Sequence, residues 1–350
     1  MTAGRSGGRE RASGADPTAR SGPWRWTAPA WLFAAAALAC GCPAFHATAF
    51  PDDRPGRLFA TIDGVALRYT DRGQGPAVVL LHGYGSSLDV WDPVVPALET
   101  RHRVVTLDLK GFGRSARPAG DYSPAAQAAL VLGLLDRLGI ERAAVVAHSW
   151  GSSVALALAL AAPERVTRLA LYDAWVYEEQ LPPFLTWSRA PGLGEFLFAG
   201  WYAERVADKM ALAFYDPTRL TQELVDALEE ALERPGTVAA ALAAARGQRF
   251  EELEERYRTI DRPVLLLWGR EDAVSRLAIG ERLASELPDA RLVVYPRCGH
   301  FPMVEALAAS TRDLVEFLAA DLAGGGTGEA PGEGSAARSA AELSATGGAP

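Results

Sequence analysis

The sequence predicts an α/β fold, in which a mostly parallel eight-stranded sheet carries helices on both faces and a helical cap is inserted late in the chain. Three observations support this prediction. Short runs rich in apolar and β-branched residues alternate with helical patterns up to about position 173. Several runs, such as 77–81 and 143–147, are continuously apolar, as buried parallel strands require. The alternation stops over 174–260 and then resumes.

The individual elements follow from local patterns. Asp63-Gly64 is typical of a tight hairpin between the first two strands. Ser123 and Pro124 suit the N-cap and first turn of a helix that Gly139 would end. The predicted strands are 58–62, 65–72, 77–81, 103–107, 143–147, 166–172, 264–268 and 291–295. The predicted helices are 124–138, one that follows Ser149 and stops before Pro163, 275–287, and about 304–322.

The interval 174–260 reads as several helices, including 221–232 and 237–246, and is predicted to be the cap. Its first half holds ten of the chain's thirty aromatic residues. Two interpretations are open: these side chains form the core of a small helical subdomain, or they line an apolar substrate pocket under a lid. The ten are Trp175, Tyr177, Phe184, Trp187, Phe196, Phe198, Trp201, Tyr202, Phe214 and Tyr215.

The N-terminal region has the pattern of an export signal. Residues 1–27 are rich in Arg, Gly and Ser, and an apolar run from Ala28 to Phe50 follows. This run is consistent with a cleaved signal peptide, a lipoprotein attached at Cys40, or an uncleaved membrane anchor. All three place the domain in the cell envelope or outside the cell, and a wrongly assigned start codon is the remaining alternative. The Arg- and Ala-rich composition indicates a bacterial source.

The predicted organisation is therefore a disordered basic N-terminus with a signal or anchor over 1–57, a core over 58–173 and 261–322, and a cap over 174–260. Residues 323–350 lack apolar periodicity and are predicted to form a disordered tail. The formal net charge of −8, without a Lys- or Arg-rich block beyond the N-terminus, argues against nucleic acid as a partner. The cysteines and histidines have no metal-ligand spacing, so no metal or cofactor is expected. The sequence does not indicate an oligomeric state.

Ser149 is the candidate nucleophile. It stands between a predicted buried strand and a helix, where the chain must turn sharply and lift the central side chain above the sheet. The residues two before and two after such a serine must be small to avoid collision, and Ala147 and Gly151 meet this requirement. A serine hydroxyl needs a neighbouring base to act as a nucleophile.

A second glycine-rich turn, His82-Gly83-Tyr84-Gly85, follows the strand at 77–81. The backbone N–H groups of Tyr84 and Trp150 are predicted to converge and to form an oxyanion hole. His82 could be mistaken for the catalytic base, but its expected role is to hydrogen-bond this loop.

Asp272 and His300 are the candidate orienting acid and general base. Each follows a predicted strand, and the carboxyl ends of parallel strands are where sites form in such sheets. His300 would accept the serine proton and Asp272 would hold the imidazole tautomer. Glu271 is expected to point away, and Asp173 is a second candidate acid.

In these motifs the chain resembles the α/β-hydrolase superfamily, over about Leu58 to Leu322. Within that superfamily it is similar to the group of epoxide hydrolases, haloalkane dehalogenases, C–C bond hydrolases and simple esterases. The matching motifs are His82-Gly83-Tyr84-Gly85, Asp108 to Ser115, His148-Ser149-Trp150-Gly151, Gly269-Arg270-Glu271-Asp272 and Gly299-His300-Phe301. The order Ser, Asp, His along the chain is also that of the superfamily.

The resemblance implies hydrolysis through an acyl-enzyme. Epoxide hydrolases and dehalogenases of this kind carry Asp at the elbow, so Ser149 disfavours their chemistry. The expected activity is hydrolysis of a carboxylic ester, or a related acyl compound, of a small apolar substrate. Cleavage of a C–C bond in a diketone-like substrate and cofactor-free haloperoxidase or perhydrolase chemistry are the alternatives. A non-catalytic ligand-binding protein of the same fold is the alternative outside enzymes.

Overall fold

The computed structural model describes residues 43–202, 210–220 and 222–324. The basic stretch, Cys40 and the first part of the apolar run lie outside these ranges, as does the predicted tail beyond Gly324. Within the described ranges, none of the helices combines the length and apolar character needed to cross a bilayer.

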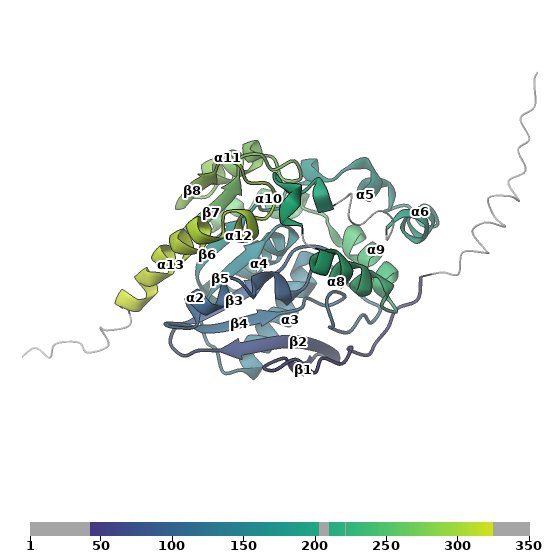
Figure 1. Ribbon diagram of the computed structural model, residues 1–350, viewed down its shortest axis with the longest axis horizontal. Helices are drawn as coiled ribbons and strands as arrows, with labels where there is room; N and C mark the ends of the chain where they lie inside the picture. The colour runs from purple at the N-terminus through teal and green to yellow at the C-terminus, as the bar shows by residue number, and fades with distance from the viewer. Residues whose placement is uncertain (1–42, 203–209, 221, 325–350) are drawn as a thin grey trace, which may run out of the picture. The chain divides into compact units, whose positions relative to one another are not determined.

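The core is a sheet of eight strands in the order β1-β2-β4-β3-β5-β6-β7-β8 (Figure 1). β1 and β2 form an antiparallel hairpin, β2 is antiparallel to β4, and the remaining neighbours are parallel. The predicted fold class is therefore confirmed. The strands are β1 (Leu58–Ile62), β2 (Val65–Arg72), β3 (Ala77–Leu81), β4 (Arg103–Leu107), β5 (Ala143–His148), β6 (Val166–Tyr172), β7 (Val264–Gly269) and β8 (Ala290–Tyr295).

Helices cover both faces of the sheet because side chains alternate between the faces along each strand. Val79 and Leu81 of β3 pack into a core with α3, α4 and α11, whereas Val78 and Leu80 pack into a second core with α2 and α13. The helices flanking the sheet are η1 (Leu88–Trp91), α2 (Val95–Leu98), α3 (Pro124–Arg137), α4 (Trp150–Ala161), η2 (Pro163–Arg165), α11 (Leu277–Glu286), α12 (Pro302–Glu305) and α13 (Leu307–Gly324).

The local signals for turns and caps have the predicted effects. Asp63 and Gly64 both have positive φ in the β1–β2 turn, at 47° and 79°. The Ser123 hydroxyl accepts the N–H of Ala126 at the start of α3, and Gly139, at φ 66°, follows its end. The early strands therefore lie where the sequence predicts them.

The C-terminal helix is the element that the prediction describes wrongly. A single helix is expected over about 304–322, but the structure has α12 and α13, separated at Ala306. Ala306 has φ −116° and ψ 32°, outside the helical region. The Ser310 hydroxyl donates to the carbonyl oxygen of Pro302 at 3.0 Å and so ties α13 to α12 across the break.

Residues 43–57, which we call the N-terminal strap, lie against the core, so the described fold begins before the predicted boundary at Leu58. His46 and Arg117 exchange two backbone hydrogen bonds, and the Phe50 N–H donates to the Arg114 carbonyl. The last part of the apolar run, from His46 to Phe50, is therefore hydrogen-bonded to a loop of the core. A segment inside a bilayer could not make these contacts.

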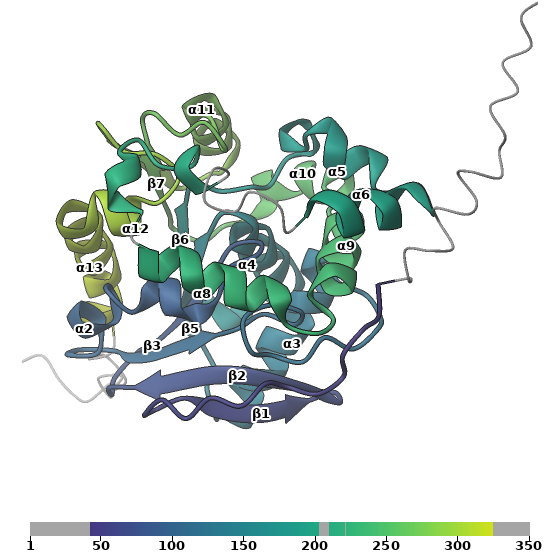
Figure 2. The same ribbon diagram turned by 45° about the vertical axis from the view of Figure 1, so that its right-hand side comes forward.

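The segment between β6 and β7 is helical, and in both views its helices lie beside the sheet rather than within it (Figures 1 and 2). Its aromatic side chains Phe184, Phe198 and Tyr202 stack in pairs, with ring centroids 5.1 and 5.2 Å apart. We call this segment the cap. Its described elements are η3 (Glu178–Gln180), α5 (Pro183–Trp187), α6 (Leu193–Trp201), η4 (Pro217–Arg219), α8 (Gln222–Glu233), α9 (Thr237–Gly247), α10 (Glu251–Glu254) and η5 (Tyr257–Thr259).

Candidate active site

The sharp turn between β5 and α4 carries Ser149 at its apex. Ser149 has φ 51° and ψ −126°, a backbone conformation that residues with a side chain rarely adopt. A Cβ atom on Gly151 would lie 2.5 Å from the carbonyl oxygen of His82, so glycine is required there. Ala147 is fully buried on the other side of the turn. Both small residues are therefore explained by close packing around a raised serine.

The three predicted side chains meet beyond the carboxyl ends of β5, β7 and β8. His300 Nε2 lies 2.9 Å from Ser149 Oγ, and His300 Nδ1 lies 2.7 Å from Asp272 Oδ2. Because a carboxylate only accepts, Nδ1 carries the ring proton and Nε2 can accept the serine hydroxyl hydrogen. Asp272 Oδ1 also accepts the N–H groups of Val274 and Ser275, which hold the carboxylate in place. We call this arrangement the Ser149–His300–Asp272 relay.

The loop after β3 brings the second predicted oxyanion donor next to the serine. A Cβ on Gly83 would lie 3.0 Å from the Ser149 Cβ, so the loop backbone approaches the elbow closely. The rings of Tyr84 and Trp150 are in edge-to-face contact at 6.1 Å. Among the described residues, no acceptor is assigned to the backbone N–H of Tyr84 or of Trp150. An oxyanion hole formed by these two groups stays a prediction.

His82 holds the loop, as predicted. Its Nε2 accepts the Leu109 N–H at 3.0 Å, so its Nδ1 carries the proton and donates to the Gly83 carbonyl at 2.7 Å. Both ring nitrogens are therefore used by backbone groups. His82 cannot serve as the base for Ser149 in this arrangement.

His148, immediately before the nucleophile, supports the loop that carries the candidate base. Its Nε2 lies 2.8 Å from the carbonyl oxygen of His300 and donates to it. Burial lowers the pKa of His148 well below its usual value, and the nearby His300 acts in the same direction. His148 is therefore neutral and positions the backbone of His300.

The structure also distinguishes the candidate acids. Glu271 is exposed and accepts the Cys298 N–H, away from His300, as predicted. Asp173 is buried near the relay and accepts the N–H of Gly269. It forms no hydrogen bond with the imidazole among those assigned in the described residues, so Asp272 is the acid that orients His300.

A cavity of about 640 Å³ opens at Ser149 and His300. Its apolar wall comes from the core and the cap together. The apolar side chains that line it include Val90, Met210, Phe214, Leu228, Phe301 and Val304. A cavity of this size suits a small molecule rather than a polymer.

Five arginines also line this cavity: Arg54, Arg68, Arg114, Arg219 and Arg234. Arg68 is buried, and its guanidinium forms ion pairs with Asp52, Asp89 and Asp108. Arg54 is 48% exposed, although Asp52 and Asp89 pair with it. Arg219 is 57% exposed, and the carboxylate oxygen of Asp216 is 3.7 Å from it. Arg219 is therefore the more accessible of the two guanidinium groups, whereas Arg54 is held by its two aspartates.

The sequence interpretation did not identify these arginines. Arg54 belongs to the strap, which was assigned to the export region, and Arg219 ends the short helix η4 of the cap, where the sequence has no motif. Arginine is frequent along the whole chain, so composition offers no signal for either residue. Only the fold brings them to the cavity that contains Ser149.

The aromatic residues of the cap mostly do not form the cavity wall. Phe184, Phe198 and Tyr202 pack within the cap, and Trp187 is 61% exposed. Phe214 is the described aromatic residue of the predicted cap that lines the cavity, where it stacks on Phe301 at 4.9 Å. Most of the cluster therefore matches the interpretation as a subdomain core.

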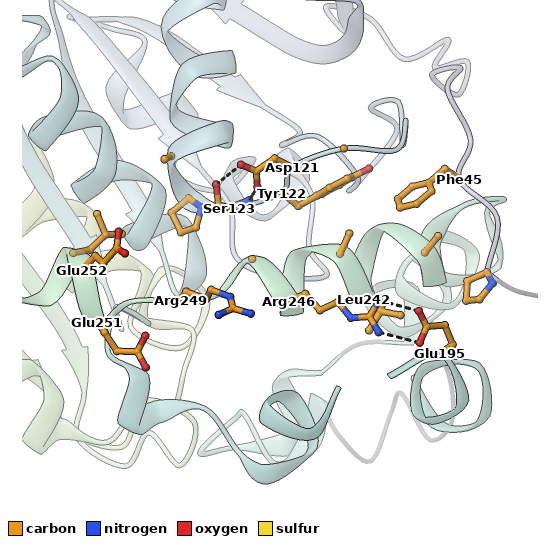
Figure 3. A pocket seen from close by; sticks show the side chains of 18 residues that line it. Phe45, Asp121, Tyr122, Ser123, Glu195, Leu242, Arg246, Arg249, Glu251 and Glu252 are labelled. Carbon is orange, nitrogen blue, oxygen red and sulfur yellow. Dashed lines mark hydrogen bonds and ion pairs between the residues drawn. The ribbon is translucent and has the colours of Figure 1, made fainter. Parts of the chain in front are cut away.

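A second cavity, of about 740 Å³, lies between α9 and the loop before α3 (Figure 3). In it the Arg246 guanidinium turns to the Glu195 carboxylate at 2.9 Å, and Phe45 of the strap stacks near Tyr122. Neither Ser149 nor His300 lines this cavity. It is therefore separate from the candidate active site, although it is slightly larger.

Comparison with known proteins agrees with the fold and with the class of site. The family model described as "alpha/beta hydrolase fold" matches residues 76–307. The chain is 33% identical over 269 residues to the 2-hydroxy-6-oxononadienedioate/2-hydroxy-6-oxononatrienedioate hydrolase of Paraburkholderia xenovorans, which covers 73% of this chain and 91% of that protein. It is 33% identical to a 2-hydroxymuconate semialdehyde hydrolase of Pseudomonas putida, over 73% of this chain and 92% of that protein.

Among solved structures, the meta-cleavage product hydrolase CumD from Pseudomonas fluorescens IP01 superimposes with a TM-score of 0.64 at 30% identity. The match covers 75% of this chain and 97% of that chain. The names of these relatives agree with the C–C hydrolase alternative better than with the ester hydrolysis that the sequence led us to expect first. The fold, the match over 76–307 and the relatives together show that the chain belongs to the α/β-hydrolase family of enzymes.

Proposed function

We propose that this enzyme hydrolyses a C–C bond next to a ketone in a small substrate that carries a carboxylate. The observation that carries the proposal is one cavity that is lined by Ser149 and His300 of the Ser149–His300–Asp272 relay and also by Arg219, an exposed and loosely paired cation, with Arg54 beside it. The similarity to hydrolases of oxo-dienoates and of a muconate semialdehyde supports it, because those substrates carry carboxylates. Apolar side chains along the cavity suit the carbon chain between the two ends.

The relay supplies the reaction steps. His300 Nε2 accepts the proton of Ser149 while Oγ adds to the ketone carbon, and Asp272 stabilises the resulting imidazolium. The backbone N–H groups of Tyr84 and Trp150 then stabilise the oxyanion. When the oxyanion collapses, the C–C bond breaks, and the leaving carbon takes the electron pair and receives the proton from His300. Water, deprotonated by the same imidazole, finally releases the acid from Ser149.

A leaving carbanion must be stabilised for this step to proceed. A second carbonyl in conjugation with the leaving carbon achieves this, because the electron pair becomes an enolate. The carboxylate beside that carbonyl would be the group that the arginines bind, through charge-assisted hydrogen bonds. The arginines would thus orient the substrate so that its ketone, at the other end, faces Ser149.

Ester hydrolysis is the second candidate. The relay and the two oxyanion donors serve an ester carbonyl as well as a ketone, and an alkoxide leaves more readily than a carbanion. The apolar wall formed by Met210, Phe214 and Leu228 would accept an uncharged acyl or aryl group. This candidate does not require Arg54 or Arg219.

A matched pair of substrates separates the two candidates. The enzyme would be supplied with a 2-hydroxy-6-oxo dienoate and with an aryl ester of the same length. Each substrate would be tested with its carboxylate free and with that carboxylate blocked as a methyl ester. We expect kcat/KM to be highest for the ketone with a free carboxylate, and we expect Ser149→Ala to abolish its cleavage. Faster turnover of the ester would favour the second candidate.

Failure of a fluorophosphonate to label the folded wild-type protein at Ser149 would favour a binding protein.

We also propose that the enzyme is exported, on the basis of the basic and apolar pattern that precedes the strap. Mass spectrometry of the mature N-terminus, after cell fractionation, distinguishes a cleaved signal from lipid attachment at Cys40. An intact N-terminus on a cytoplasmic protein would contradict export.

A further inference from the structure

A second carboxyl group lies beside the relay and takes no part in the steps above. Asp173 follows β6, as Asp272 follows β7, and Asp173 is fully buried. One side-chain oxygen of each aspartate and one ring nitrogen of His300 lie within 4.8 Å of one another. Asp173 has φ 43°, a conformation that is uncommon for a residue other than glycine. The backbone is thus held in an unusual state where it places this carboxyl next to Asp272.

The two carboxyl groups are unequally supplied with hydrogen bond donors. Asp272 accepts from the His300 ring and from two backbone N–H groups. Within the part of the chain that the structure describes, the bond assigned to Asp173 is the one it accepts from the Gly269 N–H, at 2.9 Å through Oδ1. Its Oδ2 is buried, and no donor among the described residues reaches it. An unpaired carboxylate oxygen in such a place is costly, whereas a protonated one can donate to the neighbouring carboxylate.

We propose that Asp173 is a neutral carboxylic acid that donates its Oδ2–H hydrogen bond to the Asp272 carboxylate, and that it acts as a positioning residue for the relay. Two adjacent buried carboxyl groups cannot both ionise at low cost. The proton therefore resides on the group with fewer donors, Asp173, and Asp272 stays the anion that faces His300. The expected effect of Asp173 on turnover rests on the serine chemistry proposed above. The protonation of Asp173 does not depend on that chemistry.

The charges around Asp173 favour the neutral form. Burial raises the pKa of Asp173 well above its usual range, the charge of Asp272 adds to this, and Glu305 acts in the same direction. The Gly269 N–H opposes the shift only in part. The other titratable groups facing it are His300, Tyr172 and Cys298. Within the described residues, no basic side chain forms an ion pair with Asp173 that could balance a second negative charge.

The hydrogen bond gives Asp272 a further donor. Carboxylate oxygens accept several hydrogen bonds, and each one limits the rotation of the group. It also lowers the basicity of Asp272, so that the proton on His300 Nδ1 stays on the ring when imidazolium forms. Asp173 thus preserves the tautomer that lets Nε2 act as the base.

Infrared spectroscopy tests the proton directly. Wild-type enzyme labelled with carboxyl-¹³C aspartate is expected to show, at neutral pH, the C=O stretching band of a protonated carboxylic acid, shifted by the isotope. We expect D173N to lose this band and E271Q to keep it, since Glu271 is an exposed neighbour that also accepts one backbone N–H. Absence of the shifted band from the wild-type enzyme would overturn the proposal, whether or not any variant folds.

Variants test the positioning role. The amide of D173N can accept from Gly269 and donate to Asp272 as the acid does, so kcat/KM should stay within about threefold of wild type. D173L has a similar shape but no donor, and we expect kcat to fall by about tenfold with KM unchanged. The rate of fluorophosphonate labelling of Ser149 should fall in parallel, which gives a readout that does not depend on the substrate.

Stability provides a second check. A buried acid with a raised pKa makes the protein less stable as the pH rises above the pKa that the acid has in the unfolded chain. The reason is that the unfolded state then releases the proton more readily than the folded state does. D173N has no such loss, so its Tm should exceed that of wild type increasingly as pH rises. A Tm difference between D173N and wild type that does not change with pH would show that Asp173 is ionised, and this would overturn the proposal. A folded D173N enzyme as inactive as D272N would contradict the positioning role, and this too would overturn the proposal.

Discussion

Three histidines surround the elbow, and their ring nitrogens have different contacts. His82 Nδ1 and Nε2 both bond backbone groups, whereas His148 Nε2 donates to the carbonyl of His300. His300 faces Ser149 with one nitrogen and Asp272 with the other. At the scale of single residues, the site therefore depends on what each ring nitrogen contacts.

The orienting role of Asp272 predicts a large effect from a small change. D272N keeps the shape of the side chain but donates to His300 Nδ1, which forces the proton onto Nε2. We expect kcat to fall by about 10⁴-fold, as loss of the correct tautomer does in other serine hydrolases. E271Q is the matched control and should retain wild-type kcat. A D272N enzyme with near wild-type activity would exclude Asp272 as the orienting acid.

The buried histidines predict how stability depends on pH. Burial lowers the pKa of both His82 and His148 below the usual value of 6.5, so the unfolded state binds protons that the folded state does not. The free energy of unfolding should therefore fall as pH drops below about 6.5, by about 1.4 kcal/mol per pH unit for each histidine.

The variant H148N tests this, because its amide can donate to the His300 carbonyl without titrating. Urea denaturation over a pH series should give a slope shallower than that of wild type by about 1.4 kcal/mol per pH unit. Equal slopes for the two proteins would mean that His148 is protonated in the folded state.

At the scale of elements, the Tyr84 side chain links the loop after β3 to the cap. The Tyr84 O–H donates to the carbonyl of Ala241 in α9 at 2.7 Å, and the Tyr84 ring contacts Phe112, Trp150 and Tyr202. The residue whose N–H forms half of the predicted oxyanion hole is therefore anchored to α9 of the cap.

This contact predicts that Y84F loosens the loop. The change removes the hydrogen bond to the Ala241 carbonyl and should lower the free energy of unfolding by at least about 1 kcal/mol. It should also lower kcat/KM, because the Tyr84 N–H is held less precisely. Y122F is the control: Tyr122 also donates to a backbone carbonyl, at Pro118, but lines the second cavity. Equal loss of activity in both variants would argue against a role for the cap contact.

At the scale of the whole molecule, a buried cluster of charged side chains holds the strap against the core. Asp52 Oδ2 lies 2.6 Å from Arg68 Nε, and the two side chains are 2% and 1% exposed. Burial alone would raise the pKa of Asp52, but hydrogen bonds from Arg54 and the charge of Arg68 outweigh it and lower the pKa to about 2. The same Arg68 pairs with Asp108 at the end of β4.

The cluster predicts that D52N destabilises the protein. The unfolded pKa of 3.8 and the folded pKa of about 2 correspond to about 2–3 kcal/mol at neutral pH. This contribution should be complete above about pH 4 and vanish as the pH falls towards 2, because the folded state must then be protonated. D53N, at the exposed neighbouring position, should unfold like wild type. A D52N protein as stable as D53N at neutral pH would show that the strap is not held by this pair.

Much of this molecule could be predicted from local patterns. The continuous apolar runs predicted the strands, the Asp63-Gly64 turn predicted the hairpin, and the small residues around Ser149 predicted the elbow. These features depend on contacts between residues close in the chain, or on which face of an element is buried. The order of Ser149, Asp272 and His300 at strand ends was enough to expect them at one edge of the sheet.

Other properties were decided only by the tertiary structure. The choice between Asp173 and Asp272, the packing of the strap, and the arrival of Arg54 and Arg219 in the cavity all depend on residues far apart in sequence. Local periodicity contains no information about such pairs, because burial, charge and hydrogen bonding at these positions are set by neighbours that only folding brings together. The sequence by itself therefore determined the fold and the candidate reacting groups, whereas the tertiary structure decided which acid contacts the imidazole and which side chains line the cavity.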